Sequence, residues 1–366
     1  MDLCEQSPSY VRAIAPYQPG KPISELAREM GLKEKSIIKL ASNENPLGVS
    51  PKAKAAIKKE LAELGRYPDG NAFDLKAALA KRYKVPEECI VVGNGSNDLL
   101  EMAAGVFLGP GRSAVYSQHC FAVYPLATQA RGARSIVVPT KNWGHDLHAM
   151  RAAIAPDTRV VFIANPNNPT GTFVPGAALE EFLASAPREV AVVVDEAYTE
   201  YLPREVRYDS VAWLKKYPNF ILTRTFSKVY GLAGLRVGFG LMRPEVADLM
   251  NRVRQPFNVN SLALAAATAA LGDAKFVARS VKLNQQGMAA LERAFKRLGL
   301  EHIPSYANFI TFRVERAAEV YAKLLRQGVI VRPIAGYGMP EHLRVTVGTS
   351  KENARFLKAL EAALDD

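Results

Sequence analysis

The feature that most constrains this fold is an alternation along the chain between short apolar runs and longer helix-like segments. Segments such as 98–107 and 177–186 have helical periodicity, and they separate runs rich in β-branched residues. Several of these runs are continuously apolar, which is typical of strands buried on both faces of a sheet. The alternation predicts a three-layer α/β domain, in which helices cover both faces of a mainly parallel sheet. The predicted strands are 90–92, 159–164, 190–194, 220–222 and 237–241.

The C-terminal part of the chain follows a different pattern, which predicts a smaller α+β domain. Its expected elements are a helix at 275–298 and strands at 308–314, 329–332 and 343–347. The proline-rich N-terminal segment resembles an arm or a contribution to that domain, so we expect the small domain to be formed from both chain ends. The predicted segments are 1–40 (arm and part of the small domain), 41–272 (large domain) and 273–366 (C-terminal small domain).

The composition favours small anionic ligands. The 366 residues are 48% hydrophobic and 23% charged, which is typical of a globular protein. There are 47 Lys and Arg against 36 Asp and Glu, a net charge of +11. No nucleic-acid-binding motif accompanies the densest basic cluster, at 52–59, so we interpret it as a solvated helix face. We therefore expect a small-molecule substrate, and neither a nucleic acid nor a membrane partner.

Other features bear on the location of the chain and on metals. No apolar run reaches the ~18 residues of a membrane span, and the N-terminus has no secretory signal. Cys4, Cys89 and Cys120 are scattered without CxxC spacing, which fits free thiols in a reducing cytoplasm. His145 and His148 are spaced H-x-x-H but have no evident third ligand, so no metal is expected.

Polar residues follow the predicted strands, where open α/β sheets bind their ligands. After the strand at 90–92, Gly93–Asn97 forms a glycine-rich turn that leads into a helix and can present N–H groups to an anion. An ordinary tight turn is the alternative, because the Rossmann and Walker patterns are both absent. After the strand at 159–164, two prolines enclose Asn168, which indicates a loop that positions this amide.

Two further strand ends carry ionisable groups. Asp195 follows a buried strand, where a carboxylate is costly without a partner, and the phenol of Tyr198 comes three residues later. A cationic ring nitrogen is a natural partner, and a helix cap or a structural ion pair is the alternative. Lys228 lies among Thr225, Ser227, glycines and Arg236. A lone lysine is usually a solvated surface residue, but these neighbours indicate an amine nucleophile beside an anion.

Together these groups match the needs of pyridoxal 5'-phosphate: an amine, a carboxylate for the ring nitrogen, a phenol, an amide and a phosphate cradle. The segment Thr225-Phe-Ser-Lys-x-x-Gly-x-x-Gly-x-Arg236 resembles the lysine signature of class II aminotransferases, which have the aspartate aminotransferase fold, type I of the pyridoxal-phosphate-dependent transferases. Further segments resemble the histidinol-phosphate aminotransferase subgroup: 16–22, 40–48, 66–70, 328–333 and 343–348.

The resemblance implies cofactor-binding roles. Lys228 would hold the cofactor covalently and move the substrate proton, and Asp195 would keep the ring nitrogen protonated. Asn168 and Tyr198 would bind the phenolic oxygen of the ring, and Phe121 would stack on its face, where many relatives have tyrosine. The other cofactor-binding residues, which include the phosphate ligands, would be Gly95, Ser96, Asn97, Thr225, Ser227 and Arg236.

The resemblance also implies substrate and partner contacts. Arg344 would bind the α-carboxylate of glutamate with its bidentate guanidinium. Arg332, with Tyr17, would receive the phosphate of histidinol phosphate, and Asn168 would also contact the substrate. Tyr67 would reach the cofactor phosphate in a partner subunit, which implies a homodimer with shared sites.

The implied reaction is reversible amino transfer between L-histidinol phosphate and 2-oxoglutarate, giving imidazole acetol phosphate and glutamate, in histidine biosynthesis. One alternative is an aromatic amino acid aminotransferase of the same subgroup, and another is threonine-phosphate decarboxylase. A cofactor-binding transcription regulator would need an N-terminal DNA-binding module, for which we expect no room before Leu40. His119 and Cys120 are unusual beside Phe121, and packing is the role expected of them.

Overall fold

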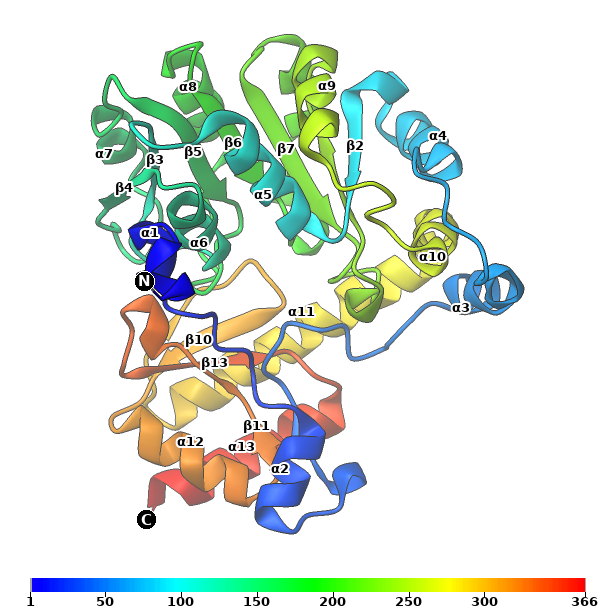
Figure 1. Ribbon diagram of the computed structural model, residues 1–366. Coiled ribbons are helices and arrows are strands. Elements are labelled where there is room, and N and C mark those ends of the chain that lie inside the picture. Colours follow the sequence, from blue (N-terminus) through cyan, green and yellow to red (C-terminus); the bar gives the residue numbers. More distant parts are fainter. Residues whose placement is uncertain (1, 366) are drawn as a thin grey trace.

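The large domain is built around a seven-stranded sheet of order β2-β8-β7-β6-β5-β3-β4 (Figure 1). The computed structural model describes residues 2–365, so the outermost residues of the predicted end segments, Met1 and Asp366, lie outside the described part. The strands are β2 (Ile90–Gly93), β3 (Ser113–Ser117), β4 (Arg134–Val138), β5 (Thr158–Ala164), β6 (Ala191–Asp195), β7 (Phe220–Thr225) and β8 (Gly238–Leu241).

The sheet is mainly parallel, as predicted. Strands β4, β3, β5, β6 and β7 run parallel, whereas β8 is antiparallel to both of its neighbours. The five predicted strands are all present. Strands β3 and β4 were not predicted: β3 begins and ends with serine, and β4 is a largely exposed edge strand that begins with Arg134 and Ser135, so that its apolar residues are confined to 136–138.

Helices cover both faces of this sheet. In β6, Val192 and Val194 join the apolar cluster on one face, whereas Val193 joins the cluster on the other. This alternation shows why the strand is apolar throughout. One face packs against α3 (Pro51–Glu60), α4 (Phe73–Tyr83), α7 (Leu147–Ala152), α8 (Gly176–Ser185) and α10 (Ser261–Leu271). The other packs against α5 (Ser96–Phe107), α6 (Val123–Ala130) and α9 (Pro244–Val253).

The small domain contains two further sheets. Strands β12 (Arg332–Pro333), β13 (His342–Thr346), β10 (Phe309–Arg313) and β9 (His302–Ile303) form an antiparallel sheet in that order. Its core also includes residues of α11 (Ala274–Arg297), α12 (Ala317–Arg326) and α13 (Ser350–Asp365). The predicted strand at 329–332 is therefore split, because Val329–Ile330 forms β11 in a different sheet.

The N-terminal segment joins this domain. Strand β1 (Ile38–Lys39) pairs in parallel with β11, and Leu26 of α2 (Ile23–Met30) packs against Leu325 and Ile330. In Figure 1 the blue N-terminal helix α2 accordingly lies beside the red and orange C-terminal elements. These contacts support a small domain formed from both chain ends, while the boundaries at residues 40 and 272 stay a prediction.

The remaining helices are short. Helix α1 (Ser9–Arg12) contacts α6 of the large domain. The 3₁₀ helices are η1 (Leu3–Gln6), η2 (Glu34–Ser36), η3 (Leu61–Glu63), η4 (Glu87–Cys89), η5 (Thr199–Tyr201), η6 (Arg204–Val206), η7 (Ser210–Lys215), η8 (Ala233–Leu235) and η9 (Ala335–Tyr337). Within residues 2–365 no single helix has the length and apolarity of a membrane span, although α10 and α11 pass that test together as a pair bent by 82°.

Candidate active site

A cavity of about 270 Å³ lies where residues of both domains meet at the carboxyl ends of β5, β6 and β7. It brings together most of the predicted site residues. Those that line it are Tyr17, Ser96, Asn97, Phe121, Asn168, Asp195, Tyr198, Thr225, Ser227, Lys228, Arg236, Arg332 and Arg344.

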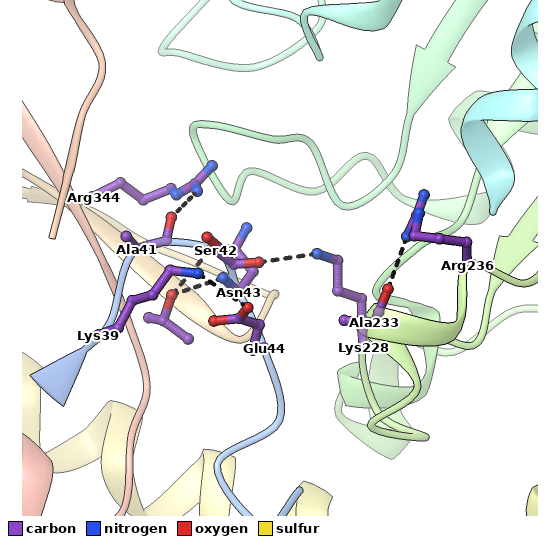
Figure 2. Close-up of polar contacts among 10 residues, drawn as sticks. Lys39, Ala41, Ser42, Asn43, Glu44, Lys228, Ala233, Arg236 and Arg344 are labelled. Carbon is purple, nitrogen blue, oxygen red and sulfur yellow. Dashed lines mark hydrogen bonds and ion pairs between the residues drawn. The ribbon is translucent and has the colours of Figure 1, made fainter. Parts of the chain in front are cut away.

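Lys228 extends into this cavity from the segment that follows β7. Its Nζ donates a hydrogen bond to the carbonyl of Ser42 at 3.3 Å (Figure 2). The ring centroid of Tyr198 is 5.7 Å from Nζ. Burial, helped by the nearby charge of Arg344, lowers the pKa of Lys228 to about 8. A substantial fraction of this amine is therefore neutral near physiological pH, as a nucleophile or base requires.

Asp195 lies at the end of β6 with only 4% of its surface exposed. Its Oδ1 accepts a hydrogen bond from Thr223 Oγ1 at 2.9 Å, and its Oδ2 accepts one from the Tyr124 hydroxyl at 3.3 Å. Both partners are neutral, and burial raises the pKa of Asp195 to about 6. A cation that entered the cavity beside this carboxylate would relieve the cost of its burial. The donor set thus fits a protonated ring nitrogen.

An anion cradle lies where β7 and β8 approach the N-terminus of α5. Arg236 Nη1 donates to Ser227 Oγ at 3.3 Å. It also donates to the Ala233 carbonyl at 3.1 Å, and this contact is drawn in Figure 2. Gly95 precedes α5 with φ of +86°, and a Cβ there would lie 2.3 Å from Arg236 Nη2. No side chain caps α5, so its first N–H groups remain available to an anion. This space fits a phosphate between backbone and guanidinium.

Polar and aromatic side chains surround the space between Lys228 and Asp195. The Tyr198 hydroxyl accepts a hydrogen bond from Asn43 Nδ2 at 2.9 Å, and burial raises the pKa of this phenol to about 12. Phe121 lines the same cavity and meets the ring of Tyr124 edge-on at 5.9 Å between centroids. Asn168, between two cis peptide bonds at Pro166 and Pro169, accepts a hydrogen bond from Arg344.

Two arginines face each other across β12 and β13. Arg332 and Arg344 are register partners, and both are largely buried. Arg344 Nη2 donates to the carbonyl of Ala41 at 2.8 Å (Figure 2), and Arg344 Nε has no hydrogen-bond partner among the described residues. Arg332 Nη2 donates to the Gln18 carbonyl at 2.6 Å, and its guanidinium carbon lies 5.5 Å from the Tyr17 ring centroid. These partners are neutral, so the two cations are arranged to receive an anion.

Tyr67 is placed differently. It does not line the cavity of its own chain, 82% of its surface is exposed, and its ring stacks on Phe257 at 4.8 Å between centroids.

Several residues of the site were not assigned a role from the sequence. Asn43 bonds Tyr198 and also receives a hydrogen bond on its carbonyl from Asn308. Tyr124 and Thr223 bond Asp195. For Asn43 the available signal is that the segment 40–48 resembles a motif of the histidinol-phosphate aminotransferase subgroup. Tyr124 and Thr223 gave none, because an aromatic residue in a helix and a threonine in a strand are ordinary core residues.

His145, one of the two histidines of the H-x-x-H spacing, makes structural contacts. His145 Nε2 donates to the carbonyl of Ala164 at 2.8 Å, so its Nδ1 accepts from Ser117 Oγ at 2.7 Å. Burial lowers the pKa of His145 to about 4, which keeps it neutral. Across residues 2–365 no group of three or more His, Cys, Asp or Glu is placed to hold a metal ion.

Comparison with known proteins gives consistent matches over the whole chain. Residues 35–360 match the family described as Aminotransferase class I and II. The chain is 62% identical over 364 residues to histidinol-phosphate aminotransferase 1 of Dechloromonas aromatica, covering 100% of both chains. It is 62% identical over 366 residues to histidinol-phosphate aminotransferase 2 of Nitrosospira multiformis, covering 100% of this chain and 93% of that one. The solved structure of histidinol-phosphate aminotransferase from Sinorhizobium meliloti in complex with pyridoxal-5'-phosphate superimposes with a TM-score of 0.90, at 26% identity and 98% coverage of each chain.

Proposed function

The chain belongs to the class I and II aminotransferase family, and we propose that it transfers an amino group reversibly between L-histidinol phosphate and 2-oxoglutarate in histidine biosynthesis. It is a transaminase of fold type I that uses pyridoxal 5'-phosphate. The observation that carries the substrate assignment is the pair of buried arginines, Arg332 and Arg344, in the cavity that also holds Lys228. Arg332 can bind the phosphate of one substrate, and Arg344 can bind the carboxylate of the other.

We assign the cofactor contacts by the chemistry of each donor. Lys228 would attach the cofactor covalently, Asp195 would pair with its ring nitrogen, and Phe121 would cover its ring. Asn168 and Tyr198 would bind the phenolic oxygen. The phosphate would lie in the cradle formed by Gly95, Ser96, Thr225, Ser227 and Arg236, with Asn97 lining the same wall. When bound, pyridoxal phosphate supplies an electron sink for bonds at the substrate α-carbon.

The protein moves the proton and orients the substrate. The neutral amine of Lys228, favoured by its lowered pKa, takes the α-proton of the amino donor in the first half-reaction and delivers a proton to the α-carbon of the oxo acceptor in the second. Arg344 holds the α-carboxylate of glutamate, and Arg332 with Tyr17 holds the substrate phosphate. Because both arginines lie on adjacent strands, the two substrates use one cavity in succession, as a ping-pong reaction requires.

We also assign a homodimer located in the cytoplasm. The surface around Tyr67 includes the exposed aromatic rings of Phe73 and Phe257, and apolar patches of this kind mark interfaces between chains. If a partner subunit covered this surface, Tyr67 would lie near the cofactor phosphate bound by that partner subunit. The two buried cysteines are free thiols, as expected in a reducing compartment.

Steady-state kinetics tests the substrate assignment. With 2-oxoglutarate as the acceptor, we expect kcat/KM for L-histidinol phosphate to exceed that for phenylalanine by at least about tenfold, because a phosphate dianion engages the Arg332 guanidinium and the Tyr17 hydroxyl, which a benzyl side chain does not. A higher value for phenylalanine would instead identify an aromatic amino acid aminotransferase. Release of carbon dioxide from threonine phosphate without 2-oxoglutarate would identify a decarboxylase.

A further inference from the structure

His119 bridges the two domains at the edge of the active-site cavity. It belongs to the large-domain loop after β3, and its Nδ1 lies 2.7 Å from the carbonyl oxygen of Tyr337 in η9 of the small domain. A carbonyl only accepts, so Nδ1 carries the proton and donates. Tyr337 lines the cavity, whereas His119 does not. The histidine therefore contacts the active site through the tyrosine.

The imidazole is itself held firmly. Only 5% of His119 is exposed, and its carbonyl accepts a hydrogen bond from Asn167 Nδ2 at 2.7 Å. Its ring lies 5.4 Å from the ring of Trp143, which in turn meets the ring of His342 at 5.0 Å. These contacts fix the loop of His119 against Asn167, the neighbour of Asn168. Phe121 follows two residues later in the same loop. The donor is thus anchored on the cofactor-binding side of the cleft.

The loop of Tyr337 is shaped to meet this donor. Gly338 has φ of +73°, a conformation that favours glycine, and a Cβ at this position would lie 3.5 Å from His119 Cε1. Ile334 and Met339, on either side of Tyr337, are buried in a small cluster with Ile303. The turn is therefore fixed at its base, and the hydrogen bond from His119 fixes its tip.

The phenol of Tyr337 lies in the field of both substrate-binding arginines. The charges of Arg344 and Arg332 act on it, and burial raises its pKa, so the hydroxyl stays protonated and can donate. A phosphate has three terminal oxygens, one more than a carboxylate. After a guanidinium and the Tyr17 hydroxyl have each engaged one oxygen, a phosphate still offers a third oxygen to a further donor, whereas an arginine fork already engages both oxygens of a carboxylate.

We propose that Tyr337 is a specificity-determining residue that donates a hydrogen bond to the phosphate of the phosphorylated substrate, and that His119 is the residue that positions it. This inference rests on the proposed function. Tyr337 gives the phosphorylated substrate a contact that glutamate does not receive, and the hydrogen bond from His119 holds the Tyr337 loop against the large domain.

Three variants of the holoenzyme test this. Tyr337→Phe removes the hydroxyl, and His119→Leu removes the donor. His119→Asn is nearly the same size as His119→Leu but retains an N–H close to the position of Nδ1. For Tyr337→Phe and His119→Leu we expect KM for L-histidinol phosphate to rise about tenfold, with kcat and KM for glutamate within about twofold of wild type. His119→Asn should recover most of the loss. His148→Leu, the same change at an exposed histidine, should have no effect.

The result that overturns the proposal is an unchanged KM for L-histidinol phosphate in Tyr337→Phe. An equal loss in His119→Asn and His119→Leu would also overturn the positioning role, because packing rather than the hydrogen bond would then be responsible. The visible absorbance of the lysine-bound cofactor, which a merely misfolded variant would lose, should be unchanged in all variants. Failure of the proposed function is distinguishable, since the wild-type enzyme would then not turn over L-histidinol phosphate at all.

Discussion

The guanidinium of Arg344 donates a hydrogen bond to the side-chain oxygen of Asn168 and so joins the small-domain sheet to the loop after β5. The same side chain bonds the carbonyl of Ala41, in the segment that leads from the N-terminal arm into the large domain. One residue thereby couples three parts of the chain that meet at the cavity. Through these two hydrogen bonds, Arg344 holds the loop of Asn168 and the segment at Ala41 in fixed positions relative to the small-domain sheet.

Arg344→Lys should weaken glutamate binding strongly. A lysine keeps the charge but loses the planar fork that binds a carboxylate with two parallel hydrogen bonds. We expect KM for glutamate to rise on the order of fiftyfold. Arg313→Lys, on the neighbouring strand β10, changes an exposed arginine paired with Glu341 and is the matched control. Equal KM values for the two variants would contradict the assignment of Arg344.

Covalent capture of the cofactor should depend on pH through Lys228. Because burial and the charge of Arg344 lower the pKa of this amine to about 8, the neutral form accumulates as pH rises through 8 rather than 10.5. Mixing cofactor-free enzyme with pyridoxal phosphate, followed by visible absorbance, should give a capture rate that rises with an apparent pKa of about 8. Lys228→Ala should show neither capture nor turnover at any pH, and the exposed Lys215→Ala should behave as wild type. Capture by Lys228→Ala would exclude this residue as the attachment site.

Asp195→Asn should stabilise the cofactor-free protein while impairing cofactor binding. The pKa of Asp195 is 3.8 in an unfolded chain and about 6 in the fold, so its contribution to stability is complete below pH 3.8 and is lost as pH rises through 6. At pH 8 the variant avoids a buried charge and should gain on the order of 3 kcal/mol in free energy of unfolding, since one pKa unit is about 1.4 kcal/mol. Denaturant unfolding at pH 8 and pH 5 measures this, and the gain should shrink at pH 5. A gain that grows toward low pH would contradict the argument.

Gly95→Ala should abolish tight binding of the cofactor phosphate. A methyl group there would lie 2.3 Å from Arg236 Nη2, and φ of +86° is strained for alanine. We expect the Kd for pyridoxal phosphate to rise at least about thirtyfold. Gly234→Ala, in the same region but with open space around a Cβ, should change it little. Fluorescence titration of the cofactor-free proteins compares the two variants.

Tyr67 and Lys228 should complement each other between subunits. If Tyr67 serves the partner's cavity, a hybrid dimer of Lys228→Ala and Tyr67→Ala chains has one site with both residues intact and one with neither. Co-expression of the two variants should then give more activity than the sum of the separate proteins. If each chain used its own Tyr67, every site in the hybrid would carry one defect, and no activity would be recovered.

The sequence predicts the inner part of this structure better than its edges. Asp195 and Lys228 follow continuously apolar strands, so the rule that ligands bind at strand ends located them directly. Strand β4 was not predicted, because this edge strand is largely exposed and does not alternate between buried and exposed side chains. Asn43 was missed because its importance comes from contacts with Tyr198 and Asn308, which are distant along the chain. Residue spacing does not encode such contacts, and only the family resemblance of segment 40–48 points to this residue.

The pairing of β1 with β11 has a consequence for synthesis of the chain. Ile38 leaves the ribosome about 290 residues before its partner Val329. The large-domain sheet, which requires neither, can form first. Until Val329 emerges, strand β1 has no partner strand, and the substrate-binding arginines Arg332 and Arg344 take their positions only after the strands of the large domain have been synthesised. A nascent chain would therefore hold a cofactor cradle before it could recognise a substrate.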